Sequence, residues 1–110
     1  MTRVQVVYWR QIPAQVKARQ GSERASRPLS DRFQQAIDDA AMSAGLSGTD
    51  AYLAEWHTSE GEDRPGDPQA AAESMAGELD AAYSAARLAA LAAAGGLEAG
   101  YPAPGHGKPW

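Results

Sequence analysis

Two short clusters of aromatic and charged residues contain the side chains of this chain that are best suited to binding a partner. Tyr8, Trp9 and Arg10 are consecutive, and so are Trp56 and His57. Tyrosine, tryptophan and arginine are common at protein interfaces because they bury a large area and keep a polar group available. The pattern therefore indicates an interaction surface with Trp9, Arg10 and Trp56 as its candidate residues. The competing interpretation places the rings in the core; we expect this for Tyr8 and favour it for Trp56, and it stays open for Trp9.

The sequence lacks the residue sets that common enzymes and metal sites require. It contains no cysteine, and its two histidines, His57 and His106, are too few for a zinc site of the usual kind. The acidic loop 60–67 lacks the order of carboxylates that a calcium loop needs. No Ser/His/acid set, phosphate loop or dinucleotide fingerprint is present. We therefore expect no enzyme, no bound metal and no cofactor.

The charges are divided unevenly along the chain. Residues 1–32 hold seven cations and two acids, whereas residues 33–110 hold three cations and twelve acids, for a net charge of -4. The basic residues Lys17, Arg19, Arg24 and Arg27 could bind phosphates, but the segment 14–32 contains no aromatic residue for base stacking. We therefore expect no nucleic-acid binding. The basic residues are interpreted as a solvated edge and loop, facing the acidic half of the chain or an acidic partner.

The N-terminal residues predict a strand pair. Residues 3–9 are rich in β-formers and apolar on both faces, which favours a central strand. Pro13 favours a turn or bulge before a second strand at about 14–20, whose outward charges are typical of an edge. Residues 21–28 are polar, show no periodicity and are expected to form a loop.

Two helices and one ambiguous segment follow. The first helix begins at Ser30, a good N-cap, and ends before Gly45. Residues 51–59 fit either a strand or a helix capped by Thr49 or Asp50. We favour the strand because a two-stranded hairpin alone would be weakly buried. The second helix opens at Asp67-Pro68, runs to about Ala94 and is stopped by two glycines.

Together these elements predict an α+β domain over residues 1–94. Its small three-stranded sheet, in the order β-β-α-β-α, has two helices packed on one face, and a Gly/Pro-rich disordered tail follows at 95–110. No stretch has the roughly 20 apolar residues needed to cross a bilayer, and the N-terminus lacks a secretory signal. We therefore expect a cytoplasmic protein with no membrane interaction.

Three blocks of the sequence resemble a known bacterial family. They are VVYWRQIPAQV (6–16), RFQQAIDDAAMSAGLSGTDAYLAEW (32–56) and AAYSAARLAAL (81–91). Their order and spacing are similar to those of the virulence-factor domain family, and the resemblance covers about residues 3–93. Gln11 departs from the family pattern, in which an acidic residue is commoner at that position. The resemblance therefore implies no function for a charge beside Arg10.

The resemblance implies an accessory role and supplies no catalytic residues. Longer relatives join a similar domain to helical repeats and to a module resembling part of iron–sulfur scaffold proteins. Short alphaproteobacterial relatives tend to be encoded among genes of corrinoid- and folate-dependent methyl transfer. We expect a non-enzymatic accessory protein that docks to a larger bacterial protein. The alternative is a folate- or corrinoid-binding accessory subunit in one-carbon methyl transfer that uses aromatic stacking.

Overall fold

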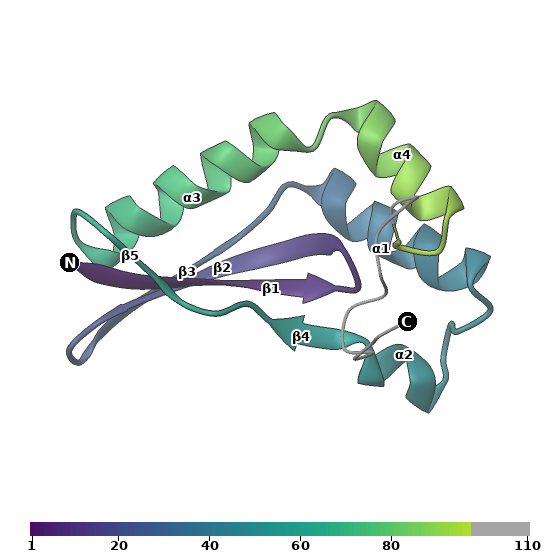
Figure 1. The fold of residues 1–110 in the computed structure, drawn as a ribbon, viewed down its shortest axis with the longest axis horizontal. Helices are drawn as coiled ribbons and strands as arrows, with labels where there is room; N and C mark the ends of the chain where they lie inside the picture. Colours follow the sequence, from purple (N-terminus) through teal and green to yellow (C-terminus); the bar gives the residue numbers. More distant parts are fainter. Residues whose placement is uncertain (98–110) are drawn as a thin grey trace.

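A computed structural model describes residues 1–97, which form an antiparallel sheet of five strands with four helices (Figure 1). The elements are β1 (Thr2–Trp9), β2 (Ile12–Gln20), β3 (Glu23–Pro28), α1 (Asp31–Ser43), α2 (Asp50–Ala54), β4 (Trp56–Thr58), β5 (Glu62–Arg64), α3 (Pro68–Ala82) and α4 (Ala85–Ala93). The strand order is β3-β2-β1-β4, and β5 also pairs with β1. The α+β class is as expected, but the predicted three-stranded sheet with two helices is wrong.

β1 lies at the centre of the sheet, as its apolar residues on both faces predict. It pairs with β2 along one edge and with β4 and β5 along the other. Its buried residues are even-numbered up to Val6, but the next buried residue is Trp9 rather than Tyr8. The change coincides with a register shift between Val7 and Tyr8, where Ala14 of β2 is left unpaired, and a bulge of this kind increases the local twist of a strand pair.

Two strands lie where the sequence predicts loops, and those predictions are wrong. β3 occupies most of 21–28, and β5 lies within 60–67. Neither strand has the alternation of apolar residues that identifies a strand in a sequence. Backbone pairing with β2 and β1 supports them instead, and Gly21 supplies a left-handed residue (φ 61°) for the β2–β3 turn. β2 is therefore an internal strand and not the predicted edge.

The ambiguous segment 51–59 contains both a helix and a strand. α2 is a short helix whose N-cap, Thr49, accepts a hydrogen bond from the Tyr52 N–H (3.2 Å). Only Trp56–Thr58 is a strand, so the favoured strand prediction is wrong for the first half of the segment. The alternative helical interpretation, with its cap at Thr49, is right for that half.

The helix predicted from Pro68 to about Ala94 is divided in two. Asp67 caps α3 as expected, accepting from the Ala70 N–H at 2.8 Å. The chain leaves helical geometry at Tyr83 (φ −107°, ψ 85°), and Ser84 then caps α4. This break lets α3 lie along the sheet, whereas α4 packs on α1 beside the β1–β2 turn (Figure 1).

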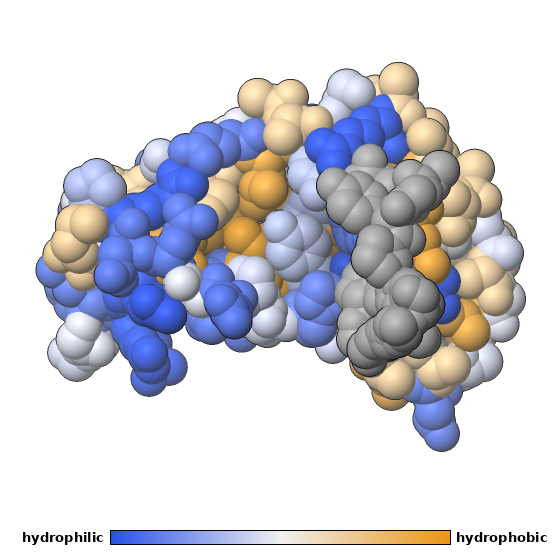
Figure 2. Space-filling model, viewed as in Figure 1, coloured by the Kyte–Doolittle hydropathy of each residue, from blue (hydrophilic) through white to orange (hydrophobic). Residues whose placement is uncertain are grey.

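The core lies between the sheet and the helices. Its largest fully buried apolar side chains come from β1, β2, α1 and α4: Trp9, Phe33, Ile12, Ile37, Leu91, Val4 and Val16. Alanines make up much of the remaining buried surface of α1 and α3. Hydrophilic residues gather at the end of the molecule that carries β5 and the β2–β3 turn (Figure 2). None of the helices within residues 1–97 has the length and apolar content that a bilayer span requires. The predicted disordered tail lies, from residue 98 onward, outside the described residues.

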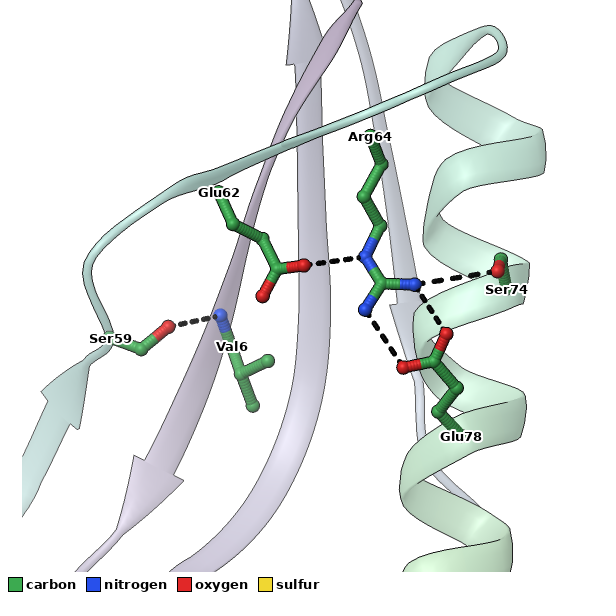
Figure 3. A network of polar contacts seen from close by, with 6 residues as sticks. All are labelled: Val6, Ser59, Glu62, Arg64, Ser74 and Glu78. Carbon is green, nitrogen blue, oxygen red and sulfur yellow. Dashed lines mark hydrogen bonds and ion pairs between the residues drawn. The ribbon is translucent and has the colours of Figure 1, made fainter.

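An arginine joins β5 to α3 (Figure 3). The Arg64 guanidinium makes a two-pronged contact with Glu78, including Nη2 to Oε1 at 2.8 Å, and its Nε donates to Glu62 at 2.9 Å. The Ser59 hydroxyl accepts from the Val6 N–H at 2.9 Å and holds the preceding loop on β1. The short strand β5 is therefore anchored at both ends by polar contacts.

Substitution of Glu78 should reveal this anchor through its pH dependence. Hydrogen bonding to Arg64 lowers the pKa of the Glu78 carboxyl in the folded protein. The pair therefore stabilises the fold above the ordinary carboxyl pKa, and this contribution is lost as the pH falls through the lowered value. We expect Glu78→Gln to reduce the free energy of unfolding, measured with urea, at about pH 7, and to reduce it progressively less as the pH falls below the ordinary carboxyl pKa.

The matched control is Glu60→Gln, which removes the same charge from an exposed residue of the loop before β5. It should change the unfolding free energy less than Glu78→Gln at neutral pH. Equal effects of the two substitutions, or an effect of Glu78→Gln that persists in acid, would contradict the role of this ion pair.

Candidate functional site

The turn between β1 and β2 has an unusual backbone. Trp9 pairs with Ile12, so the turn consists of Arg10 and Gln11. Arg10 has φ 52°, in the left-handed region that glycine usually occupies, and such a residue costs on the order of 1–3 kcal/mol. A backbone conformation of this kind persists only when the surrounding structure imposes it. Contacts with other segments must therefore hold Arg10 in place.

Three segments hold the turn through its backbone. The Arg10 N–H donates to the Glu55 carbonyl at 3.2 Å, and the Gln11 N–H donates to the Gly96 carbonyl at 2.9 Å. The Arg10 carbonyl lies 2.7 Å from His57 Nε2. Because a carbonyl only accepts, Nε2 carries the proton in this contact. The turn is thus bonded to the end of α2, to β4 and to the segment after α4.

The Arg10 side chain joins the same segments. Its Nε donates to Glu55 Oε1 at 3.1 Å and its Nη1 to the Gly95 carbonyl at 3.0 Å. The two side chains are only 18% and 25% exposed, so this ion pair is mostly shielded from water. Removing one partner of such a pair is costly because the other charge remains buried. Arg10 is therefore a positioning residue, and little of it is available to a partner.

Trp9 is fully buried, with 0% of its surface exposed. Its indole Nε1 donates to the Tyr52 carbonyl at 2.9 Å, and its ring lies 5.5 Å from the Tyr52 ring. A side chain added at Gly96 would come within 3.0 Å of the Trp9 ring, so the backbone passes directly over the indole. The expectation that Trp9 offers an exposed face is wrong, because Tyr52 and the Gly96 backbone cover its indole.

The remaining aromatic residues pack on one another. Trp56 pairs with Trp9 across β1 and β4, is partly buried, and meets the Tyr52 ring edge-on at 6.2 Å. Tyr8 stacks on His57 with ring centroids 5.5 Å apart. Tyr8 is only partly buried, so its expected place in the core is half right, and burial raises the pKa of its hydroxyl.

The β1–β2 turn, the end of α2, β4 and the segment after α4 meet at Arg10 and form a junction. One side of this junction reaches solvent. Leu53 on α2 is 64% exposed, and β4 follows shortly after it with the partly buried Trp56 and the exposed His57. We call Leu53, Trp56 and His57 the junction surface. Among the candidate residues, the structure thus brings Trp9, Arg10 and Trp56 together, but only Trp56 contributes to the exposed side.

Sequence reasoning missed the residues that support this surface. Leu53 belongs to a face that only the helical interpretation of 51–59 would have identified. Gly95 and Gly96 were assigned to the tail, yet both are buried against Trp9 and Arg10. Two successive glycines at a helix end were the available signal, because a close approach of backbone to a ring requires a residue without a side chain. Within residues 1–97, no three His, Asp or Glu side chains are grouped so as to hold a metal.

The structure is that of a small α+β protein. Trp9 is buried and Arg10 is mostly shielded from water in its junction, and Leu53 is exposed on the short helix α2. The family model described as "Virulence factor" matches residues 7–92, so the chain belongs to the virulence factor family. This confirms the resemblance that its sequence blocks indicate. No curated protein and no solved structure matches the chain significantly. The description of the family names neither a reaction nor a ligand.

Replacement of Gly96 tests the packing of the junction. Gly96 has φ 92°, and an added Cβ would lie 3.0 Å from the Trp9 ring and 3.2 Å from the Arg10 Cβ. We expect Gly96→Ala to lower the free energy of unfolding by about 1–3 kcal/mol, as measured by denaturant titration.

Gly77→Ala is the control for the same change of residue. Gly77 lies within α3 and is exposed, and a Cβ added there would meet no atom within 4 Å. Alanine there should raise the stability by about 0.5–1 kcal/mol because it favours the helix. If both variants shifted stability in the same direction, Gly96 would not be a packing requirement.

Proposed function

We propose that this chain is a non-enzymatic, cytoplasmic accessory protein that docks on a larger bacterial protein through the junction surface. The proposal rests on one observation, the exposure of Leu53 on α2, three residues before a partly exposed Trp56 that is held on a rigid base. Leu53 is one of the large apolar side chains that remain mostly exposed. At protein interfaces a few side chains supply most of the binding energy, and tryptophan is enriched among them.

The base beneath the surface supports this proposal. Trp56 is fixed by pairing with Trp9 and by the Tyr52 ring, and His57 is fixed by its contact with the Arg10 carbonyl. Side chains that are already ordered lose little conformational entropy when a partner binds, so more of the contact energy becomes affinity. The strained turn at Arg10 contributes to this rigidity, because it bonds to both the end of α2 and β4.

The alternative, a folate- or corrinoid-binding subunit, has less support. Stacking of a flat ligand needs an aromatic face that is free to receive it. Here Tyr8 already stacks on His57, and Trp9 and Trp56 both contact Tyr52. We therefore retain the docking function as the proposal.

A photo-crosslinking residue at position 53, in the full chain expressed in its native host, would identify the partner. The affinity of the purified partner would then be compared between the wild type and Leu53→Asp. A charge placed at an apolar anchor should weaken binding at least about tenfold, measured by titration calorimetry.

The matched control is Ala70→Asp, which adds the same charge to an exposed residue at the distant end of α3 (Figure 1). It should bind within about twofold of the wild type, a difference of about 0.4 kcal/mol. Circular dichroism would confirm that both variants fold. Equal affinities for Leu53→Asp and the wild type would refute docking through this surface.

A further inference from the structure

The face of the sheet turned away from α3 carries a row of arginines. Arg3 on β1 is opposite Arg19 on β2, and Arg19 is opposite Arg24 on β3. The next row on this face consists of Gln5, Lys17 and Ser26. We call the side chains of these two rows the outer face. They line a shallow concavity of about 500 Å³.

The alternation of the strands establishes which way these residues point. Val4, Ala18 and Ala25 are paired in the intervening row, and the first two are fully buried beneath the helices. Arg27 is on the helix side, where it reaches Glu73 of α3 at 3.2 Å. Residues of the neighbouring rows therefore project to the opposite side. Arg3, Lys17, Arg19 and Arg24 are all exposed there.

These cations differ in their partners from four of the other arginines. Arg10, Arg27, Arg32 and Arg64 each pair with a carboxylate within 3.2 Å. On the outer face, Arg3 lies 3.8 Å from Asp63, whereas Lys17, Arg19 and Arg24 pair with no carboxylate within residues 1–97. Their lack of partners is informative because the sequence contains more acids than cations.

Like charges directly opposite one another on adjacent strands destabilise a sheet. Three arginines in one row therefore oppose folding slightly, and an anionic occupant would relieve the repulsion. We propose that the outer face binds an acidic helix of a partner protein, with the helix axis lying along the arginine row. This site is separate from the junction surface and does not depend on it.

The spacing of the row favours a helix as the occupant. Adjacent strands are about 4.8 Å apart, so neighbouring arginines in the row are separated by roughly that distance at the backbone. Carboxylates at positions i, i+4 and i+7 of a helix have Cβ atoms about 5–6 Å apart and share one face. Three such carboxylates can each meet one arginine, and the planar guanidinium suits a two-pronged contact with a carboxylate.

A nucleic acid fits this face less well. The two rows contain no aromatic residue on which a base could stack. Acidic residues border the row as well, since Glu23 begins β3 and Asp63 lies beside Arg3. A long polyanion that tracks beyond the row would meet these carboxylates, whereas a single helix face confined to the row would not.

The test is fluorescence anisotropy with the intact protein and three labelled helical peptides of equal length. One carries glutamates along a single face at i, i+4 and i+7, one has glutamines at those positions, and one has the same glutamates distributed around the helix. We expect the first peptide to bind at least about tenfold more tightly than the other two. The double variant Arg19→Gln/Arg24→Gln should lose that preference.

Arg27→Gln is the matched control because it removes an arginine from the opposite side of β3. It should bind the single-face peptide within about threefold of the wild type. Equal binding of the single-face and distributed peptides would overturn the proposal, and so would an equal loss in both arginine variants. Tighter binding of a single-stranded DNA probe would assign the face to nucleic acid instead. Self-association that disappears in the double variant would assign it to a second copy of this chain.

Discussion

The strained turn at Arg10 is the constraint on which the rest of this structure depends. A left-handed arginine is tolerated because its N–H, its carbonyl and its guanidinium all have partners from other segments. Those same partners fix the end of α2, the start of β4 and the glycines after α4. The turn therefore converts four separate pieces of chain into one junction, with the Trp9 indole enclosed at its centre. The exposed position of Leu53 is a consequence of this arrangement.

Sequence patterns identified the elements whose side chains meet the core. β1 and α1 have clear apolar periodicity, and the caps at Asp67 and Thr49 have residue types with a known preference. β3 and β5 escaped prediction because their stability comes from backbone pairing and from ion pairs such as Arg64 with Glu78. Such long-range contacts leave no local pattern. The break at Tyr83 was missed for a related reason, since the alanine-rich sequence on both sides favours a continuous helix.

The candidate site, like the fold, was predicted only in part from the sequence. Sequence reasoning found Trp9, Arg10 and Trp56, and the structure does bring them together. It could not tell which of them face solvent, because the groups that cover Trp9, Tyr52 and Gly96, come from distant parts of the chain. The register shift after Val7 likewise depends on the partner strand and cannot be read from β1 alone. The outer face also cannot be predicted without the register, since Arg3, Arg19 and Arg24 form one row only in the sheet.

The contact of the Arg10 guanidinium with the Gly95 carbonyl spans 85 residues, nearly the whole described chain. During synthesis on the ribosome, the β1–β2 hairpin emerges before the groups that stabilise its turn. Glu55 and His57 follow from the middle of the chain, and the glycines after α4 come later still. Domains with many such distant contacts fold slowly relative to those with local contacts. The left-handed arginine therefore gains its partners in two stages, and the set is complete only when the residues that follow α4 have been made.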